Sequence, residues 1–315
     1  MVDKSLPEIR KVDAAAIEQA AQVLRAGGLV AVPTETVYGL AARADCDSAV
    51  AAIYRAKGRP DFNPLIVHVT GLEQAEKLAR FDERARDLAA RFWPGALTLV
   101  LPRRDDAALA AAVTAGLPTV ALRCPAHPAM QALLAAIDLP LAAPSANRSG
   151  AVSPTVAAHV ADSLGAKVEL ILDGGPCEAG IESTILALRE NGGWQILRPG
   201  PVTEAQISAV LGGRSGALTS QTIEAPGQLA SHYAPGKPTR LDATVAEADE
   251  FLIGFGPIAG DFNLSAKGDA AEAASRLYAA LHLAAASARP RIAIAPVPAG
   301  GIGEAIRDRL RRAAA

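Results

Sequence analysis

The chain has 315 residues, 50% of them hydrophobic and 20% charged, and its formal net charge is -2. This composition is typical of a globular protein with one large or two smaller domains, and the near-neutral charge argues against a protein that grips nucleic acid over its whole surface. The cysteines Cys46, Cys124 and Cys177 form no CxxC pair, which disfavours a zinc site or a disulfide framework. The N-terminus lacks the apolar segment of a signal peptide and no apolar run is of membrane-spanning length, so we expect a cytoplasmic protein with reduced thiols.

Helical and strand patterns alternate over the first two hundred residues. Asp13 can cap a first helix that Gly27 and Gly28 end, and Asp47 or Ser48 can cap a second helix that reaches Lys57. Short apolar segments bounded by Gly or Pro predict strands over 29–32, 65–69, 96–101, 119–122, 141–143, 170–172, 183–188 and 195–197. Further helices are predicted over 82–92, 128–136, 155–164 and 203–211. This interleaving predicts an α/β domain with a mixed, twisted sheet.

The character of the sequence changes after residue 211. Residues 212–238 are rich in Gly, Ser and Pro and show no lasting periodicity, which is typical of an interdomain linker. Strand-like segments over 251–255 and 291–295 then flank a long Ala/Leu helix over 269–287, a pattern compatible with a βαβ unit. We therefore expect a larger domain over 1–211, a linker over 212–238 and a smaller α/β domain over 239–315.

The segment KGRPDFNPLIVH, residues 57–68, places two cations in a Gly/Pro loop before a short apolar strand. Lys57 and Arg59 would suit a polyphosphate, whose charge they would meet in a site already arranged, and His68 ends the strand. The same pattern is compatible with a solvated basic loop followed by a buried strand. The segment alone does not decide between these interpretations.

Other loops that follow strands carry polar groups. Thr36 in PTETVYGL could hydrogen-bond a small polar substrate or belong to an ordinary turn. Arg123 and Arg198 each end an apolar strand and need either a structural carboxylate or an anionic ligand. Ser145 and Ser153 lie in the loop APSANRSGAVSPT, which could present hydroxyls and amides to phosphates or could be a well-capped loop.

These features together suit a nucleotide bound beside a small zwitterion. Four cations lie where strands or helices end, next to hydroxyl-rich loops: Lys57, Arg59, Arg123 and Arg198. No Walker motif, catalytic triad or GxGxxG motif is present. His127 precedes a predicted helix and is expected to cap it. Cys177 has no neighbouring histidine in the sequence, which makes a thiol nucleophile a poor candidate.

In this order, the segments resemble the threonylcarbamoyl-AMP synthase family of YrdC-like proteins. The resemblance is carried by PTETVYGL, KGRPDFNPLIVH, WPGALTLVL, PSANRSG, GGPCEAGIESTIL and ILRPGPV. The segments SHYAPGKP, NLSAKGD and GIGEAIRDRL resemble the long form of the family, which adds a smaller C-terminal domain. The resemblance implies a twisted mixed-sheet YrdC-like domain followed by a linker and a smaller βαβ-type α/β domain.

The resemblance also implies an activity. Family members are nucleotidyltransferases that make threonylcarbamoyl-AMP and pyrophosphate from L-threonine, bicarbonate and ATP, and the product serves threonylcarbamoyladenosine formation in tRNA. We expect Mg²⁺ to be carried by the ATP phosphates, without a metal site in the protein. The product would pass to a tRNA threonylcarbamoyl transferase, and strong direct tRNA binding is not expected.

The family motifs assign residues to both substrates. The expected threonine site consists of Thr36, His68, Arg123 and Ser183, together with the main chain at Ala143. The expected ATP site consists of Lys57, Arg59, Asn63, Thr119, Ser145, Ser153, Arg198 and Tyr233, the last folding back from the linker. Of these, Lys57 and Arg59 would be the catalytic residues, since they would neutralise charge as pyrophosphate leaves.

Two other classes of function remain open at this point. A concave cationic surface would also suit double-stranded RNA, although the near-neutral charge and the 4% aromatic content speak against such a module. A carbamoyltransferase-related enzyme that uses carbamoyl phosphate is the second alternative, but the zinc-finger and acylphosphatase-like segments usual in such enzymes are missing from this sequence. A separate interaction role for the C-terminal domain also stays open.

Overall fold

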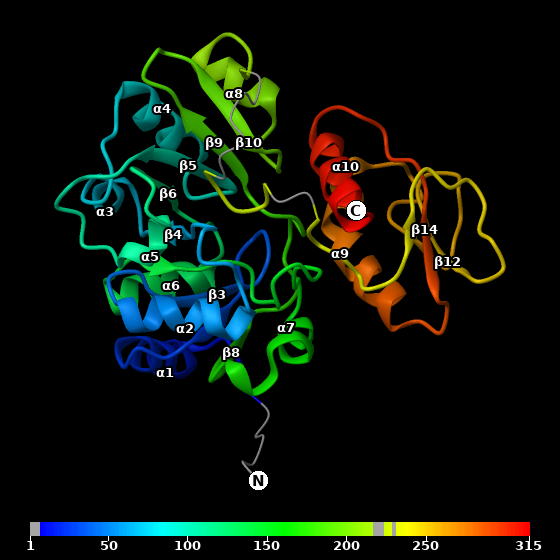
Figure 1. Cartoon of the computed structure of the whole chain (residues 1–315), viewed down its shortest axis with the longest axis horizontal. Helices are drawn as coiled ribbons and strands as arrows, with labels where there is room; N and C mark the ends of the chain where they lie inside the picture. Colours follow the sequence, from blue (N-terminus) through cyan, green and yellow to red (C-terminus); the bar gives the residue numbers. More distant parts are fainter. Residues whose placement is uncertain (1–6, 217–223, 229–230) are drawn as a thin grey trace.

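The chain forms two domains of unequal size (Figure 1). The structure, a computed structural model, describes residues 7–216, 224–228 and 231–315. The first six residues of the predicted larger domain, and residues 217–223 and 229–230 of the predicted linker, lie outside the described residues. The larger domain is built on a mixed sheet and the smaller on a parallel sheet, so the predicted fold class is confirmed.

Ten strands form the mixed sheet of the larger domain, in the order β1-β8-β2-β3-β7-β4-β6-β5-β9-β10. Their bounds are β1 Glu8–Lys11, β2 Val30–Val32, β3 Gly39–Arg43, β4 Ile66–His68, β5 Leu97–Pro102, β6 Thr119–Arg123, β7 Leu141–Ala142, β8 Leu170–Asp173, β9 Thr184–Leu188 and β10 Trp194–Arg198. The parallel pair β4 and β6 matters most for function, because its register sets His68 directly beside Arg123.

Eight α-helices pack around this sheet. They are α1 Ala14–Arg25, α2 Asp47–Lys57, α3 Leu72–Glu76, α4 Glu83–Phe92, α5 Ala111–Thr114, α6 Pro128–Ile137, α7 Ala157–Leu164 and α8 Glu204–Leu211. Two caps follow the sequence: the Asp13 carboxylate accepts the N–H of Ala16 at the start of α1, and the His127 ring accepts that of Ala129 at the start of α6. The expected capping role of His127 is therefore confirmed. The predicted cap of α2 was wrong, because Cys46 and not Asp47 or Ser48 is its N-cap, without a side-chain hydrogen bond.

Alternation along the strands builds a core on each face of the sheet. Val30 and Val32 of β2 pack in one cluster with α1 and α6, whereas Ala31 packs in the cluster on the other side with α2. Strands buried on both faces read as continuous apolar runs, which is why the sequence revealed them. In the half of the sheet from β4 to β10, helices cover one face, and Ile66 and Ala121 lie on the other in a small cluster of their own.

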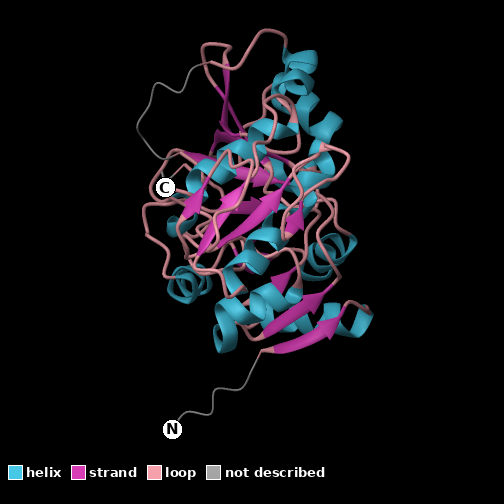
Figure 2. Ribbon diagram, turned by 90° about the vertical axis from the view of Figure 1, so that its right-hand side faces the viewer, coloured by secondary structure: helices cyan, strands magenta, loops and turns pink. Residues whose placement is uncertain are grey.

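The smaller domain has four parallel strands in the order β11-β14-β12-β13. These are β11 Thr239–Arg240, β12 Glu250–Gly254, β13 Phe262–Asn263 and β14 Arg291–Ile294, and the domain adds helices α9 Ala270–Ala286 and α10 Ile302–Ala313. The adjacent, parallel pair β12 and β14 agrees with the predicted βαβ unit. Helices α9 and α10 lie between the small sheet and the larger domain in Figure 1, and the smaller domain faces the viewer in Figure 2.

Some elements were missed in the sequence. They are β1, β3, α3, α5, β11 and β13. The strand β1 reads EIRK and is mostly exposed, so it carries no apolar pattern, and β3 follows the polar PTETVY segment that suggested only a turn. The helix predicted from 155 begins at Ala157. None of the helices in the described parts of the chain is long and apolar enough to cross a membrane.

A matched pair of isoleucines tests the placement of the core. Ile53 of α2 is fully buried, whereas Ile9 of β1 is 48% exposed. We expect Ile53→Ala to lower the free energy of unfolding by about 2–5 kcal/mol and Ile9→Ala by less than about 1 kcal/mol, because only the first leaves a cavity. Urea unfolding followed by the fluorescence of Trp93 and Trp194, both in the larger domain, measures the difference. Equal losses would contradict the described packing.

Candidate active site

A cavity lies on the face of the large sheet opposite the helix-covered core of the larger domain. Strand alternation supplies its first side chains: Ile66 and His68 of β4 and Arg123 of β6 line it, whereas Val67 and Leu122 point into the helix-covered core. This follows from the period of two in a strand, because every second residue faces the same side. The cavity therefore forms where polar residues end otherwise apolar strands.

A β-bulge brings Arg198 to the same cavity. On β10, Ile196 opposes Leu186 of β9 and Arg198 opposes Ile185, so Leu197 is an extra residue. Such a bulge bends the strand and re-aims the side chains that follow it. Without it, Arg198 would share the side of Ile196, which packs against the helix-covered core; with it, Arg198 lines the cavity.

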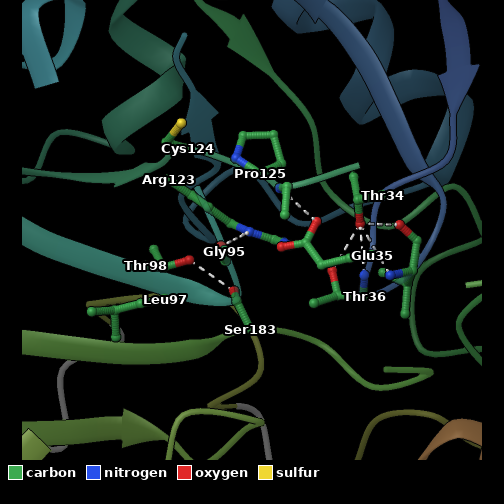
Figure 3. A network of polar contacts seen from close by, with 12 residues as sticks. Thr34, Glu35, Thr36, Gly95, Leu97, Thr98, Arg123, Cys124, Pro125 and Ser183 are labelled. Carbon is green, nitrogen blue, oxygen red and sulfur yellow. Dashed lines mark hydrogen bonds and ion pairs between the residues drawn. The ribbon is translucent and has the colours of Figure 1, made fainter. Parts of the chain in front are cut away.

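Arg123 in the cavity wall forms an ion pair with Glu35, which lies on the loop between β2 and β3 (Figure 3). Arg123 Nη2 lies 2.7 Å from Glu35 Oε1, and Arg123 Nε donates to the carbonyl oxygen of Gly95 at 3.2 Å. The second Glu35 oxygen accepts the N–H of Ala126 at 3.0 Å. Burial alone would raise the pKa of Glu35, but the Arg123 guanidinium holds it below its usual value, so the Glu35 carboxylate is ionised at pH 7.

Hydroxyl groups surround this ion pair. The hydroxyls of Thr34 and Thr36 are 2.8 Å apart, and those of Thr98 and Ser183 are 2.7 Å apart (Figure 3). Arg198 Nη2 also donates to Ser183 Oγ at 3.2 Å. Each hydroxyl can both donate and accept, so this wall can follow the donor and acceptor pattern of a small polar ligand.

His68 adds a neutral ring to the wall. Burial and the nearby Arg123 charge lower the pKa of His68 to about 3. Its Nδ1 atom is buried and has no hydrogen-bond partner among the described residues. A buried polar atom without a partner is costly unless a ligand or water completes it, so the His68 ring has a hydrogen-bonding position to offer.

Three cations near the cavity have no carboxylate within ion-pair distance in the described parts of the chain: Lys57, Arg59 and Arg198. Lys57 and Arg198 are buried and Arg59 is half-buried. Main-chain carbonyl oxygens hold them instead. Lys57 Nζ donates to the carbonyls of Ser145 and Asn147. Arg59 donates to the carbonyls of residues 63 and 64, and Arg198 to that of residue 183. Carbonyl dipoles solvate these cations without cancelling their charge, which leaves the charge available to an anion.

Burial shows in the pKa values of these cations. It lowers the pKa of Arg59 to about 10, with the Arg198 charge as a further cause, and it lowers the pKa of Lys57 well below its usual value. An anion placed among them would reverse these shifts.

The segment that joins the two domains covers the cavity. Pro226, Gly227, His232 and Tyr233 line it, and Tyr233 is 1% exposed. Gly227 has φ +84°, and a Cβ there would lie 2.8 Å from Arg198 Cδ, so only glycine fits this close approach. The cavity volume is about 40 Å³, below the roughly 300 Å³ at which small-molecule sites begin.

The predicted site residues fall into two groups. Nine of them line the cavity: Thr36, Arg59, His68, Arg123, Ala143, Ser145, Ser183, Arg198 and Tyr233. The other four, Lys57, Asn63, Thr119 and Ser153, do not line it. Three of these lie one hydrogen bond behind the wall, through the contacts Lys57–Ser145, Asn63–Arg59 and Ser153–Glu182. Thr119 begins β6, roughly 13 Å along the strand from Arg123.

Sequence reasoning missed several participants. Glu182 was not expected at the site, although it stands inside a recognised motif, GIESTIL. A carboxylate beside an apolar strand was the available signal. His232 stood in the recognised segment SHYAPGKP but was not assigned to the site, and Gly227, which also lines the cavity, was not singled out. Burial raises the pKa of Cys177 to about 12, which agrees with the expectation that it is no nucleophile.

Comparison with known proteins adds independent observations. A family model named Sua5_yciO_yrdC and described as "Telomere recombination" matches residues 22–200, and "Threonylcarbamoyl-AMP synthase, C-terminal domain" matches residues 202–315. A threonylcarbamoyl-AMP synthase of Bacillus subtilis is 48% identical over 242 residues, which cover 75% of this chain and 69% of that protein. One of Pyrococcus abyssi is 47% identical over 231 residues, which cover 70% and 65% of the two chains.

A solved structure extends this similarity to the whole chain. The crystal structure of Pyrococcus abyssi Sua5 complexed with L-threonine superposes with a TM-score of 0.89 at 38% sequence identity. The match covers 98% of this chain and 97% of that one. The similarity therefore includes both domains.

Buried neutral histidine makes a testable contribution to stability. In the unfolded chain His68 binds a proton near pH 6.5, whereas in the folded protein it does so only near pH 3. The unfolded state therefore binds more protons between these values, and stability falls as the pH falls through this window. Between pH 7 and pH 5, we expect the free energy of unfolding of His68→Gln to fall by about 2 kcal/mol less than that of the wild type. Urea unfolding at each pH measures both values. An identical pH dependence in both proteins would contradict the burial of a neutral His68.

Proposed function

Because the chain belongs to the Sua5/YciO/YrdC family and carries the C-terminal domain of threonylcarbamoyl-AMP synthases, we propose that it makes threonylcarbamoyl-AMP and pyrophosphate from L-threonine, bicarbonate and ATP. It is a transferase that forms an adenylate. One structural observation carries the proposal: Lys57, Arg59 and Arg198, which have no carboxylate partner in the described chain, converge beside a wall built around Arg123 and His68. The three cations would bind the triphosphate of ATP, and the neighbouring wall would bind the amino acid.

The reaction needs positioning more than covalent help. The threonine amine and bicarbonate form a carbamate with loss of water, and a carbamate oxygen then attacks the α-phosphorus of ATP and expels pyrophosphate. The attacking oxygen has to be held in line with the leaving group, and the negative charge on the phosphates has to be neutralised as the bond breaks. Cations already fixed in a water-excluding site supply that neutralisation without reorganisation.

The threonine subsite is proposed at the Arg123 end of the cavity. Arg123 meets the carboxylate of threonine, while the hydroxyls of Thr36 and Ser183 bind its polar groups. His68 offers a hydrogen bond without adding charge, since its ring is neutral at pH 7. The N–H of Ala143 already donates to Ile66, so the main-chain contact proposed at Ala143 uses its carbonyl oxygen.

The ATP subsite is proposed where the three cations converge. Arg59 and Arg198 face the phosphates, and Lys57 holds the loop that carries Ser145. Tyr233 lies over this part of the cavity and packs on the base or ribose after the cover reopens and closes. The remaining proposed ATP contacts are Asn63, Thr119 and Ser153.

Magnesium is proposed to arrive as part of the substrate, MgATP. The described residues hold no group of three or more His, Cys, Asp or Glu side chains suited to a metal. Glu182 lines the cavity, but its carboxylate already accepts from three donors. Magnesium that stays on phosphate oxygens fits this donor set, because it keeps several waters and few protein ligands.

The product is a reactive mixed anhydride, and we propose that a tRNA threonylcarbamoyl transferase in the cytoplasm consumes it. Strong direct binding of tRNA is not expected of this chain. The cavity cations Arg59, Arg123 and Arg198 lie under the cover, whereas a double-stranded RNA-binding module presents its phosphate-binding cations on its surface. The match of the C-terminal domain supports the synthase over a carbamoyltransferase.

The activity can be observed directly. Purified protein is incubated with MgATP, bicarbonate and labelled L-threonine, and mass spectrometry follows threonylcarbamoyl-AMP and pyrophosphate. We expect both products only in the complete mixture, because the adenylate takes one component from each substrate. Omission of each component in turn is the control. Pyrophosphate release that does not depend on threonine and bicarbonate would exclude the proposed reaction.

Removal of one cation tests the ATP subsite. We expect Arg59→Ala to lower the rate of threonylcarbamoyl-AMP formation by at least about 100-fold, because a fixed charge at the phosphates is lost. Arg80→Ala is the matched control, since Arg80 is an exposed arginine paired with Asp105 and should change nothing. Tryptophan fluorescence checks that both variants are folded. Undiminished turnover in Arg59→Ala would remove Arg59 from the mechanism.

A further inference from the structure

Glu182 connects the cavity to the smaller domain. Its Oε1 accepts from the Ser153 hydroxyl at 2.6 Å, and its Oε2 accepts from the Tyr278 hydroxyl at 2.8 Å and from Arg309 Nε at 2.8 Å. Tyr278 belongs to α9 and Arg309 to α10, so two of the three donors come from the smaller domain. One carboxylate in the cavity wall is thus held from both domains at once.

This contact is fully buried. Ser153, Tyr278 and Arg309 are 0% exposed and Glu182 is 5% exposed. Arg309 also pairs with Asp308 at 2.7 Å, and its guanidinium lies 5.3 Å from the centre of the Tyr233 ring in the cover. Buried ion pairs depend on both members, because removing one leaves an uncompensated charge in the interior.

A second contact from the same helix reaches the same loop. His282, one turn after Tyr278 on α9, lies with Nε2 3.1 Å from the main-chain oxygen of Ser153. Its ring stacks on that of His159 from α7, with centroids 3.7 Å apart. The smaller domain therefore fixes both the side chain and the main chain around Ser153, through residues that lie on one face of α9.

We propose that Arg309 of the smaller domain is a positioning residue for ATP: it neutralises Glu182 in the cavity wall and, through Glu182, holds Ser153 in the nucleotide subsite. This inference rests on the proposed function, which assigns that subsite. A bare carboxylate at Glu182 would repel a triphosphate, and a free Ser153 hydroxyl would lose its fixed orientation. The smaller domain then contributes to nucleotide affinity while touching no part of threonine.

The substitution Arg309→Met tests the proposal, since it removes the charge but keeps a long apolar side chain. We expect the KM for ATP to rise by about 10- to 100-fold, because a partly buried negative charge then faces the phosphates, while the KM for threonine stays at its wild-type value. Tyr278→Phe keeps the ion pair and should raise the KM for ATP less. Arg276→Met is the control: Arg276 is on α9 but pairs with Glu272 within its own domain, and no change is expected.

A double variant separates electrostatics from a general loss of structure. Glu182→Gln combined with Arg309→Met removes both charges, so ATP affinity should recover toward the wild type, and this variant stays informative if Arg309→Met alone does not fold. Equal increases in both KM values, or a double variant no better than the single one, would overturn the proposal. Calorimetric titration with MgATP gives the same comparison without turnover. A wild type that binds MgATP but makes no threonylcarbamoyl-AMP would refute the proposed function and leave this inference to be decided by the titrations.

Discussion

Compensation of buried positive charge is the constraint on which the rest of the structure depends. Lys57, Arg123 and Arg198 are each 4% exposed, and a cation taken out of water at such a position costs several kcal/mol unless something replaces its hydration. The fold replaces the lost hydration of these cations in two ways. Arg123 receives a carboxylate, from Glu35, whereas Lys57 and Arg198 receive carbonyl oxygens that solvate them and leave their charge uncancelled. The first kind of site suits a zwitterion and the second a polyanion.

The positions of these charges follow from backbone geometry. Period-two alternation turns His68 and Arg123 to the open face of the sheet while their neighbours fill the core. The bulge in β10 turns Arg198 to the same face, whereas strict alternation would place Arg198 on the opposite face. The last residues of β4, β6 and β10, three strands that are not consecutive in the sequence, thereby lie in one place. Burial of the apolar residues of these strands stabilises this arrangement.

Much of this could be predicted from the sequence, for reasons that also mark its limits. Strands buried on both faces are apolar throughout, so β2, β4 and β6 were visible, and arginines that end such strands had to have partners. The identity of the partners was not visible. Glu35 meets Arg123 across 88 positions and Arg309 meets Glu182 across 127, and no local pattern encodes such separations. The bulge was equally hidden, because a single extra residue leaves no mark on an apolar run.

The cover of the cavity links the proposed ATP subsite to the smaller domain. The Tyr233 ring contacts both the Tyr278 ring and the Arg309 guanidinium, so the aromatic ring that covers the cavity packs against the helices of the smaller domain. Closing it excludes water, and in the resulting low dielectric each uncancelled cation attracts phosphate more strongly. An isolated larger domain would keep the cations but not the surface on which the cover rests. The smaller domain therefore supports the cover of the charged cavity through Tyr278 and Arg309.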